Sequence, residues 1–598
     1  MSNKKTLAFR QKRNIIVIAA AILLLAALLL VVRYLVSVYD YTDVDGTKYT
    51  IKRRDGVYGL FDTNGYQLDT TVEDGNLYYV TDAGTMVSVS DDGKATVYAA
   101  VDTDDGEAVS SYKRLLVFPK VESSEVQSLR VTNEHGTYTF EKKNGSVVLK
   151  GYEYVAYDQK SYQSMIAFLG SLVTMEKYPE STVRKYGLSE YGLETPQATY
   201  TITSTLGKTY TVDIGDAIVS GNGYYAKLEG RETVYIINAY YALTLEPVES
   251  YIQPIMADGL TINNYPEVYN FKLYNYTYDA DGKPKAENLT ALTYWDYAER
   301  ENTEFQTQSY KMLDDRLACF MPNSDSVTTT MSNFASMENA KVVKLGATDA
   351  VRKQYGLDKP AKLLTYDFVL TDSKTGEKTY LRYFYWFSNI TEQGTYYAVV
   401  DAQTSTDNEN FYSASAKYDY ILEIGRSMIP MMEWNAIDWV EAYYFHRPIM
   451  LIDRIEFETP DGTIVFRLTA GKDDIERITA TMNGETRDVD IKQFKNLYRN
   501  MLYGVLFDKT GKTDEELAAV VADPARKQLS YRVVTSLKSL DYTYTFYNLA
   551  ESRSYITIHD NIGDVGGGGD FFVLTNDVMK TVRDAKNVFD GKEVTVLS

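Results

Sequence analysis

An uncharged apolar segment near the start of the chain constrains its fold more than any other feature. Residues 15–32 read IIVIAAAILLLAALLLVV and contain no charged side chain. At about 1.5 Å per residue, a helix of this length rises about 27 Å, close to the thickness of the hydrocarbon core of a bilayer. The preceding residues 1–14 carry five Lys and Arg and no Asp or Glu. The sequence therefore predicts a transmembrane signal anchor over residues 15–36, behind a cytoplasmic basic tail over residues 1–14.

A cleaved signal peptide is the alternative interpretation of this segment. Such a peptide has a shorter apolar stretch, followed by a cleavage site of small residues. Here the apolar stretch runs into Arg33 and Tyr34, and no Ala-x-Ala follows. A buried core helix is also disfavoured, because it is rarely apolar on every face. We therefore expect a single-pass protein of the cell membrane, with the N-terminus in the cytoplasm and the region from about residue 40 onward outside it.

Charge and residue usage narrow the classes of function. The 598 residues carry a net charge of -20, which disfavours a nucleic-acid partner because like charges repel phosphate backbones. Cys319 is the single cysteine, so neither an intrachain disulfide nor a zinc site built on several cysteines can form. The chain has only three histidines. We expect no cofactor, no metal site and no enzymatic activity.

Residues 40–115 are dense in hairpin dipeptides with short alternating apolar stretches between them. Asn-Gly and Asp-Gly supply the positive φ angles of tight hairpin turns. The pattern predicts a β-meander over residues 40–115. The dipeptides are Asp45-Gly46, Asp55-Gly56, Asn64-Gly65, Asp74-Gly75, Asp92-Gly93 and Asp105-Gly106.

An internal repeat organises the rest of the chain. Val126–Phe140 aligns without gaps on Ile452–Phe466, and both segments are typical of two strands joined by a Gly turn. A helix follows each copy, capped by Asp158 or Asp490. The predicted apolar stripes are Tyr162, Met165, Ile166, Leu169, Leu172 and Val173 in the first helix, and Phe494, Leu497, Tyr498, Met501 and Leu502 in the second.

A second repeated block lies after the first helix and recurs in the middle of the chain. Tyr191–Pro196 reads YGLETP, and Tyr355–Pro360 reads YGLDKP. After each block, and again near residues 570–582, we expect strands and a short helix. The sequence thus predicts an α+β fold with repeated units over residues 116–255, 256–428 and 446–598, each an antiparallel sheet packed on one longer helix.

The repeated block predicts a structural role for its residues. A glycine at 192 or 356 can take a positive φ after a helical turn, and the following proline fixes the chain as it enters the next strand. The aromatic and Leu side chains are expected to fill the seam between helix and sheet, while a repeated docking edge is the functional alternative. The structural motif residues are Tyr191, Gly192, Leu193, Pro196, Tyr355, Gly356, Leu357 and Pro360.

Other motifs that bear on chemistry are better explained by turns and packing. The glycine-rich residues 220–223 and 566–570 lack the Gly-Lys-Ser/Thr ending of a phosphate loop. The Asp-rich residues 279–282 and 102–106 lack the donor spacing of a calcium loop, although loose calcium binding is an alternative. His559 and Asp560 are adjacent in an expected strand, so they point to opposite faces. Cys319 has apolar neighbours and is expected to be an inert buried thiol.

The order of these blocks resembles the bacterial envelope family named domain of unknown function 4340. The matching residues are Leu129–Phe140, Tyr191–Pro196, Ile214–Asp216, Gly223–Ala226 and Val234–Ile237. The resemblance covers about residues 116–250, and more weakly 340–425. Members are often found beside ABC-transporter components and include relatives of the auxiliary component of gliding-motility-type ABC transporters. The resemblance implies an envelope accessory role with ABC-transporter subunits as partners, and it supplies no ligand and no catalytic residue.

Three hypotheses for function follow. The first is a single-pass, extracytoplasmic accessory or scaffold protein of an envelope ABC-transport system. The second is a surface-exposed binding module for cell-wall glycan or peptide, because a Tyr-rich β surface suits such contacts. The third is an enzyme, which a deep pocket with converging carboxylates or histidines would support, as in a two-carboxylate hydrolase.

Overall fold

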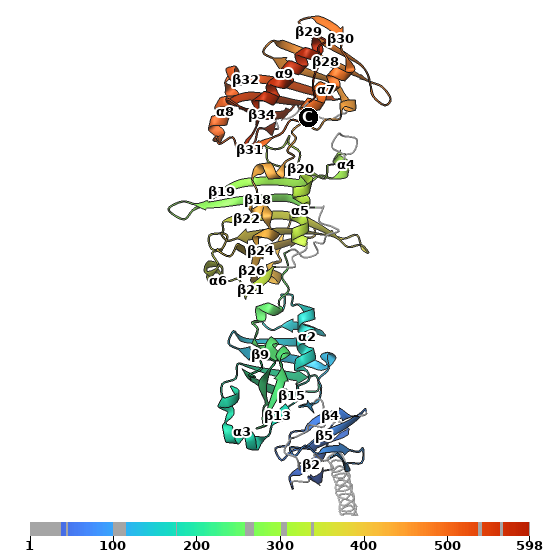
Figure 1. Ribbon diagram of the computed structural model, residues 1–598, viewed down its shortest axis with the longest axis vertical. Coiled ribbons are helices and arrows are strands. Elements are labelled where there is room, and N and C mark those ends of the chain that lie inside the picture. The colour runs from blue at the N-terminus through green and yellow to red at the C-terminus, as the bar shows by residue number, and fades with distance from the viewer. Residues whose placement is uncertain are drawn as a thin grey trace, which may run out of the picture. The chain divides into compact units, whose positions relative to one another are not determined.

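A computed structural model describes residues 38–43, 46–54, 56–73, 75–99, 115–174, 176–256, 268–300, 308–335, 340–535, 541–561 and 566–596. The chain divides into two compact units, Met1–Ile252 and Gln253–Ser598 (Figure 1). Both units are rich in antiparallel sheets with some helices, as the sequence predicts at this coarse level. The predicted basic tail and the predicted anchor over residues 15–36 lie outside the described residues. Within the described ranges, no helix combines the length and apolar character needed to cross a bilayer.

The first unit begins with two small sheets that form the meander. β1 (Val38–Thr42), β2 (Lys48–Arg54) and β3 (Val57–Phe61) form the first sheet in that order. The second sheet has the order β12-β8-β4-β5-β6-β7. Its strands are β4 (Asp69–Glu73), β5 (Asn76–Val80), β6 (Met86–Val89), β7 (Ala95–Ala99), β8 (Leu115–Leu116) and β12 (Val173–Thr174).

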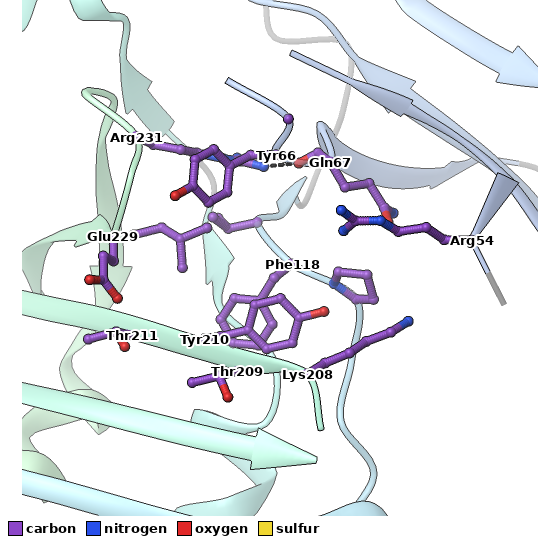
Figure 2. Close-up of a pocket in the computed structure, with 14 residues that line it drawn as sticks. Arg54, Tyr66, Gln67, Phe118, Lys208, Thr209, Tyr210, Thr211, Glu229 and Arg231 are labelled. Carbon is purple, nitrogen blue, oxygen red and sulfur yellow. Dashed lines mark hydrogen bonds between the residues drawn. The ribbon is translucent and has the colours of Figure 1, made fainter. Parts of the chain in front are cut away.

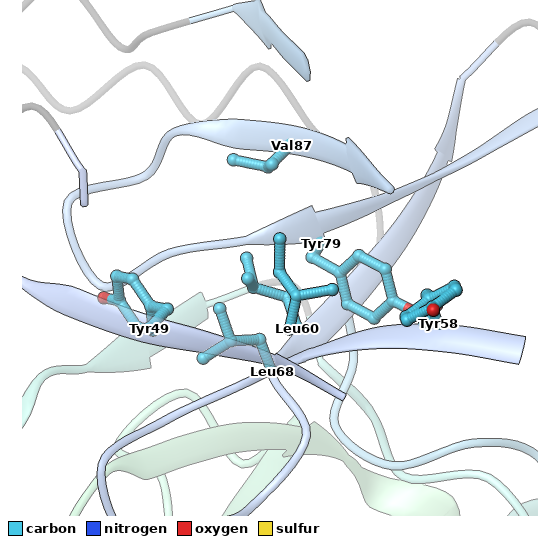
Figure 3. Packing of buried hydrophobic residues seen from close by; sticks show 7 residues of the cluster. Tyr49, Tyr58, Leu60, Leu68, Tyr79 and Val87 are labelled. Atoms are coloured by element: carbon cyan, nitrogen blue, oxygen red, sulfur yellow. The ribbon is translucent and has the colours of Figure 1, made fainter. Parts of the chain in front are cut away.

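The core of the meander is formed by Tyr and aliphatic side chains from both small sheets (Figure 3). Turn glycines bring these strands together. Gly46, Gly56, Gly65, Gly75 and Gly93 all have φ near +80°, as the hairpin dipeptides predict. The clustered residues are Tyr49, Ile51, Tyr58, Leu60, Leu68, Tyr79 and Val87.

An eight-stranded sheet follows in the first unit, with the order β11-β10-β9-β14-β15-β16-β17-β13. Its strands are β9 (Val126–Asn133), β10 (Gly136–Lys143), β11 (Ser146–Leu149), β13 (Glu176–Tyr178), β14 (Ala198–Ser204), β15 (Thr209–Ala217), β16 (Gly223–Leu228) and β17 (Val234–Asn238). The accompanying helices are α2 (Gln159–Leu169), α3 (Glu180–Tyr186) and the 3-10 helices η1 (Ser123–Glu125), η2 (Leu188–Tyr191), η3 (Ala239–Leu245) and η4 (Val248–Tyr251).

Helix α2 begins where the sequence predicts and ends earlier. The Asp158 carboxylate accepts hydrogen bonds from the backbone N–H groups of Lys160 and Ser161. The helix ends at Leu169, with Gly170 as its C-cap, so Leu172 and Val173 are not part of the helical stripe, which corrects the prediction for these two residues. Val173 lies instead in β12, where it pairs with Leu116 of the meander sheet.

The second unit contains a nine-stranded sheet with the order β20-β19-β18-β22-β23-β24-β26-β21 and β25 beside β24. Its strands are β18 (Val268–Tyr278), β19 (Pro284–Tyr294), β20 (Tyr310–Met312), β21 (Lys341–Leu345), β22 (Lys362–Thr371), β23 (Lys378–Phe387), β24 (Thr395–Ser405), β25 (Tyr412–Ser413) and β26 (Tyr420–Gly425). The helices are α4 (Tyr297–Arg300), α5 (Ser324–Ala335), α6 (Asp349–Gln354), η5 (Ser415–Tyr418), η6 (Arg426–Met428), η7 (Pro430–Glu433) and η8 (Ala436–Trp439).

A ten-stranded sheet completes the second unit, with the order β30-β29-β28-β27-β32-β33-β34-β36-β31 and β35 beside β34. Its strands are β27 (Ile452–Thr459), β28 (Gly462–Ala470), β29 (Ile475–Met482), β30 (Glu485–Asp488), β31 (Phe507–Asp508), β32 (Lys527–Thr535), β33 (Tyr542–Ala550), β34 (Arg553–Asp560), β35 (Gly566–Gly567) and β36 (Phe571–Leu574). The helices are η9 (Ile449–Leu451), α7 (Ile491–Leu502), α8 (Asp514–Ala522), η10 (Pro524–Arg526) and α9 (Thr575–Phe589).

The three large sheets follow corresponding paths. Each has a hairpin next to a four-stranded meander (β14 to β17, β22 to β26, or β32 to β36), and an edge strand beyond it. That edge strand (β13, β21 or β31) comes after a helix of about three turns and before a shorter helix. The aligned hairpins also share their register, because Leu129 pairs with Phe140 just as Ile455 pairs with Phe466.

The last sheet departs from the prediction of one longer helix. Near residues 570–582, where the sequence predicts a strand and a short helix, α9 follows β36, runs for 15 residues and packs beside α7 (Figure 1). Its buried side chains continue at intervals of three and four residues beyond Val582, namely Ala585, Val588 and Phe589. This periodicity keeps one face of the helix apolar to its end.

Candidate functional site

The first copy of the repeated block packs into a small aromatic cluster. Tyr191 and Leu193 are buried together with Val183 and Val234. The Tyr191 ring lies 5.1 Å from the ring of Tyr225, in an edge-to-face arrangement. Aromatic pairs in this geometry contribute beyond the area that they bury. These contacts pack the short helices α3 and η2 against strands β16 and β17 of the sheet.

Gly192 is held by two independent constraints. Its φ is +65°, in the left-handed region that favours glycine. A Cβ atom at this position would lie 2.7 Å from the backbone nitrogen of Asp216. The chain at Gly192 therefore passes directly against β15, and a side chain would separate them. Pro196 lies two residues before β14, which begins at Ala198.

The second copy forms an equivalent cluster with different surroundings. Leu357 is buried against Val399 and Ile421, and the Tyr355 ring lies 4.8 Å from that of Tyr397. Gly356 also has a positive φ, of +70°, but the nearest atom to a built Cβ is 4.0 Å away. The carbonyl of Pro360 accepts a hydrogen bond of 2.9 Å from the Tyr278 hydroxyl.

A buried ionic cluster joins the meander to the eight-stranded sheet within the first unit. The Asp69 carboxylate contacts the guanidinium of Arg231, and the Lys177 Nζ lies 3.4 Å from its other oxygen. The three side chains are 3%, 8% and 9% exposed. Arg231 also donates to the backbone carbonyl of Gln67 and to the Tyr235 hydroxyl, the latter at 2.8 Å. We call Asp69, Lys177, Arg231 and Tyr235 the ionic cluster.

The electrostatics of the ionic cluster keep Arg231 positively charged. Burial lowers the pKa of Arg231, but the combined interactions with Tyr235 and Asp69 outweigh it, so the net shift is upward. Burial also raises the pKa of the Tyr235 hydroxyl, and the Asp69 charge adds to that rise. Arg231 therefore stays protonated and Tyr235 neutral at physiological pH. Buried charges of this kind cost free energy unless they are paired, and here they are paired.

A cavity of about 320 Å³ lies beside the ionic cluster, between the meander and β15 (Figure 2). One wall is an aromatic pair, in which the Phe118 and Tyr210 rings stack with 4.3 Å between centroids and 10° between planes. Tyr66 covers Gly230, where a built Cβ would collide with the tyrosine ring. We call this space the meander cavity. Its other lining residues include Arg54, Gln67, Lys208, Thr209, Thr211, Glu229 and Arg231.

Three of the four charged residues that line the meander cavity are basic. Arg54, Lys208 and Arg231 are its cations and Glu229 is its one acid. The Arg54 guanidinium lies 5.1 Å from the centre of the Phe61 ring, a cation–π distance. The Nε of Arg231 is buried without a hydrogen-bond partner. The surroundings therefore favour a negatively charged guest.

The second unit contains two further cavities. One of about 260 Å³ is lined by Trp295, Tyr310, Cys319 and Asp560, among others. Burial raises the pKa of the Cys319 thiol to about 12, with a further contribution from Asp560, so the thiol is protonated at neutral pH. Cys319 is partly rather than fully buried. The other cavity, of about 820 Å³, is polar and holds five basic and five acidic side chains, including Arg316 and Asp514, whose charged groups lie 3.3 Å apart.

The remaining sequence motifs fall in turns, strands and isolated positions. Asp279 accepts hydrogen bonds from the backbone N–H groups of Asp281 and Lys283, as in an ordinary polar turn. Residues 220–222 form the turn before β16, Gly223 begins that strand, and Gly566–Gly567 form β35. The Asp-rich residues 102–106 lie outside the described residues. Over the ranges that the structure describes, no group of three or more His, Cys, Asp or Glu side chains is arranged to hold a metal ion.

The histidines also lie apart. His135 is in the β9–β10 turn, with its side chain 45% exposed. Burial lowers the pKa of His446, and its Nε2 has no hydrogen-bond partner. His559 and Asp560 are neighbours at the end of β34, and Asp560 lines the Cys319 cavity. The structure therefore brings none of the three together into one site.

The similarity to known families lies in the first unit. The family model described as Domain of unknown function (DUF4340) matches residues 148–252, from the end of β11 through η4. The matched range includes the first YGL block and Arg231, and it supports the resemblance to this family over that part of the chain. No curated protein matches the chain.

The residues of the meander cavity and of the ionic cluster were missed by the sequence analysis. Asp69 and Arg231 are 162 residues apart, and no local pattern links them. The available signals were weak. Asp69 is an acid at the start of the short strand β4, and Arg231 follows the turn glycine Gly230, which has a φ of +82°.

Proposed function

We propose that the protein is a single-pass, membrane-anchored extracytoplasmic accessory or scaffold protein associated with an envelope ABC-transport system. The anchor comes from the apolar residues 15–32, and the transporter association comes from the resemblance to the family. The proposed role is to hold partners in place rather than to transform a substrate. In this proposal the units over residues 116–255, 256–428 and 446–598 are repeated modules outside the membrane.

The observation that carries the proposal is the corresponding path of the three large sheets. The features that recur between these sheets are buried apolar residues and glycines with a positive φ. Leu129 and Phe140 correspond to Ile455 and Phe466, all fully buried, and Gly192 corresponds to Gly356. Buried apolar register and turn glycines specify a shape. A chain that repeats a shape along its length provides successive surfaces for binding, which suits a scaffold.

Co-purification tests this proposal. The full chain is extracted from membranes in mild detergent, captured through a C-terminal tag, and its partners are identified by mass spectrometry. We expect recovery of ABC-transporter subunits. The matched control keeps residues 1–39 and replaces the rest by an unrelated soluble domain, and it should lose these subunits. Repeated recovery of the full chain alone would contradict the proposal.

A second candidate function is a binding module for cell-wall glycan or peptide. The meander cavity favours it, because a stacked aromatic pair and basic side chains line the same space. Ligand sites commonly combine an apolar wall with a few placed polar groups. Binding of the purified chain to isolated wall polymers tests it, and a flat response to every polymer would remove this candidate.

A further inference from the structure

We propose that the meander cavity binds an acidic saccharide unit, with the sugar ring against Tyr210 and its carboxylate between Arg54 and Lys208. This inference rests on the second candidate function, the binding module, and names the ligand class. It does not depend on the association with a transporter.

The aromatic wall supplies a flat and fixed surface. Phe118 is 2% exposed and covers one face of the Tyr210 ring. Tyr210 itself is partly exposed and lines the cavity. Because β15 and the backing ring hold Tyr210, little conformational entropy is lost when a ligand stacks on it. The C–H face of a pyranose is apolar and matches such a ring.

The basic side chains supply the charge preference. Arg54 is exposed and approaches the cavity from the meander, while Lys208 approaches from the turn before β15 (Figure 2). Among the charged residues that line the cavity, Arg54, Lys208 and Arg231 outnumber Glu229. In a chain of net charge -20, this is a local reversal of sign. Guanidinium groups match the two oxygens of a carboxylate.

The polar lining and the size restrict the ligand further. The side chain of Gln67 lies in the lining and provides an amide group for a sugar hydroxyl. A volume of about 320 Å³ is at the lower end for ligand pockets, so one sugar unit fits better than a longer segment. A bare phosphate would use the cations and leave the aromatic wall empty. The combination of wall and charge therefore favours an acidic sugar over an inorganic anion.

Calorimetric titration of the detergent-solubilised full chain tests the inference. The probes are trigalacturonate, the neutral trisaccharide galactotriose, inorganic phosphate and a short oligoglutamate peptide. We expect saturable binding of trigalacturonate, at least about tenfold tighter than the neutral sugar, since a hydrogen bond to a charged group contributes about that factor. Phosphate and the peptide should bind more weakly than the acidic sugar.

Substitutions separate the two contributions. Arg54→Gln should weaken trigalacturonate binding about tenfold and reduce the preference over the neutral sugar. Tyr210→Phe keeps the stacked ring and should bind nearly as well, whereas Tyr210→Ala should weaken both sugars about tenfold. Lys150→Gln and Tyr154→Ala are the matched controls, because these exposed residues lie outside the cavity. Thermal unfolding of each variant shows whether it has folded.

Each outcome has a distinct meaning. Equal binding of acidic and neutral sugars would overturn the ligand class proposed here and leave the binding module standing. Tighter binding of phosphate or of the peptide would also overturn it. Binding that is unchanged in Arg54→Gln and Tyr210→Ala would show that the site lies elsewhere. Absence of binding by every probe, saccharide and peptide alike, would remove both the inference and the binding module, whereas the co-purification experiment would be unaffected.

Discussion

The two copies of the YGL block show how one sequence pattern can serve two different environments. In the first unit, edge strand β13 links the block to the meander, because Tyr178 packs near Tyr191 while the adjacent Lys177 lies beside Asp69. In the second unit, the polar contacts near the block are partly exposed. Arg352 lies 3.1 Å from Asp401, with side chains 29% and 35% exposed. The same block is thus tied to a buried charge cluster in one unit and to a solvent-accessible ion pair in the other.

The largest expected difference is between Arg231 in the first unit and Arg352 in the second. Arg231→Leu leaves Asp69 buried without its main partner and should destabilise the first unit by about 3–5 kcal/mol. Arg352→Leu should cost about 1 kcal/mol or less, because water screens that pair. Hydrogen exchange of peptides covering β17 and β24 measures the two units separately. Equal effects in both units would contradict the comparison.

A double variant provides the control for this prediction. Asp69→Leu combined with Arg231→Leu removes both of these charges and leaves Lys177 with Asp82, which lies 3.7 Å from its Nζ, so most of the stability lost in the single variant should return. If the double variant is as unstable as Arg231→Leu, the loss comes from packing rather than from the unpaired carboxylate.

The repeated glycines give the next difference. Gly192→Ala meets both an unfavourable φ and the backbone of Asp216, so we expect a loss of about 3 kcal/mol. Gly356→Ala meets only the unfavourable φ, which costs about 1–2 kcal/mol. Urea unfolding followed in each unit measures the stability that each variant loses. A larger loss for Gly356→Ala would show that the close approach of Gly192 to β15 adds little to the cost of a side chain there.

Removing the helix cap Asp158 should have the smallest effect on stability, and that effect should depend on pH. Asp158→Ala at the start of α2 should cost about 1 kcal/mol at pH 7. Hydrogen bonds from Ser161 lower the pKa of the Asp158 carboxyl below its ordinary value of 3.8. The contribution is therefore complete above that value and is lost as the pH falls through the lower folded-state pKa. Exchange rates of α2 amides in both proteins should converge under strongly acidic conditions, and a difference that persists there would argue against the cap.

Local chemistry explains which parts of the fold could be predicted. The turn glycines of the meander, the Asp158 and Asp490 caps and the register of Leu129 with Phe140 each depend on a few neighbouring residues. The pairing of Val173 with the meander sheet does not, because its partner Leu116 is far away in the sequence. Likewise, α9 continues past Val582 because its apolar face meets α7, a contact that the local sequence does not reveal.

The candidate site was harder to predict than the fold. Arg54, Phe118 and Tyr210 come from three separate segments, and each is unremarkable in its own stretch of sequence. Tertiary structure alone places the stacked pair beside the cations. The YGL residues were visible because they repeat, and the structure places them in packing clusters rather than in the cavity.

The central claim is that the chain crosses the membrane once and carries its sheets outside the cytoplasm. Site-directed thiol labelling tests it most directly. Cys319→Ala removes the single native thiol, and Leu206→Cys places a new one in the β14–β15 turn, at a position 73% exposed. Thr6→Cys in the basic tail is the matched control. We predict that a membrane-impermeant maleimide labels the Leu206→Cys protein in intact spheroplasts, and labels the Thr6→Cys protein only after the membrane is permeabilised. Labelling at position 206 that requires permeabilisation would contradict the account.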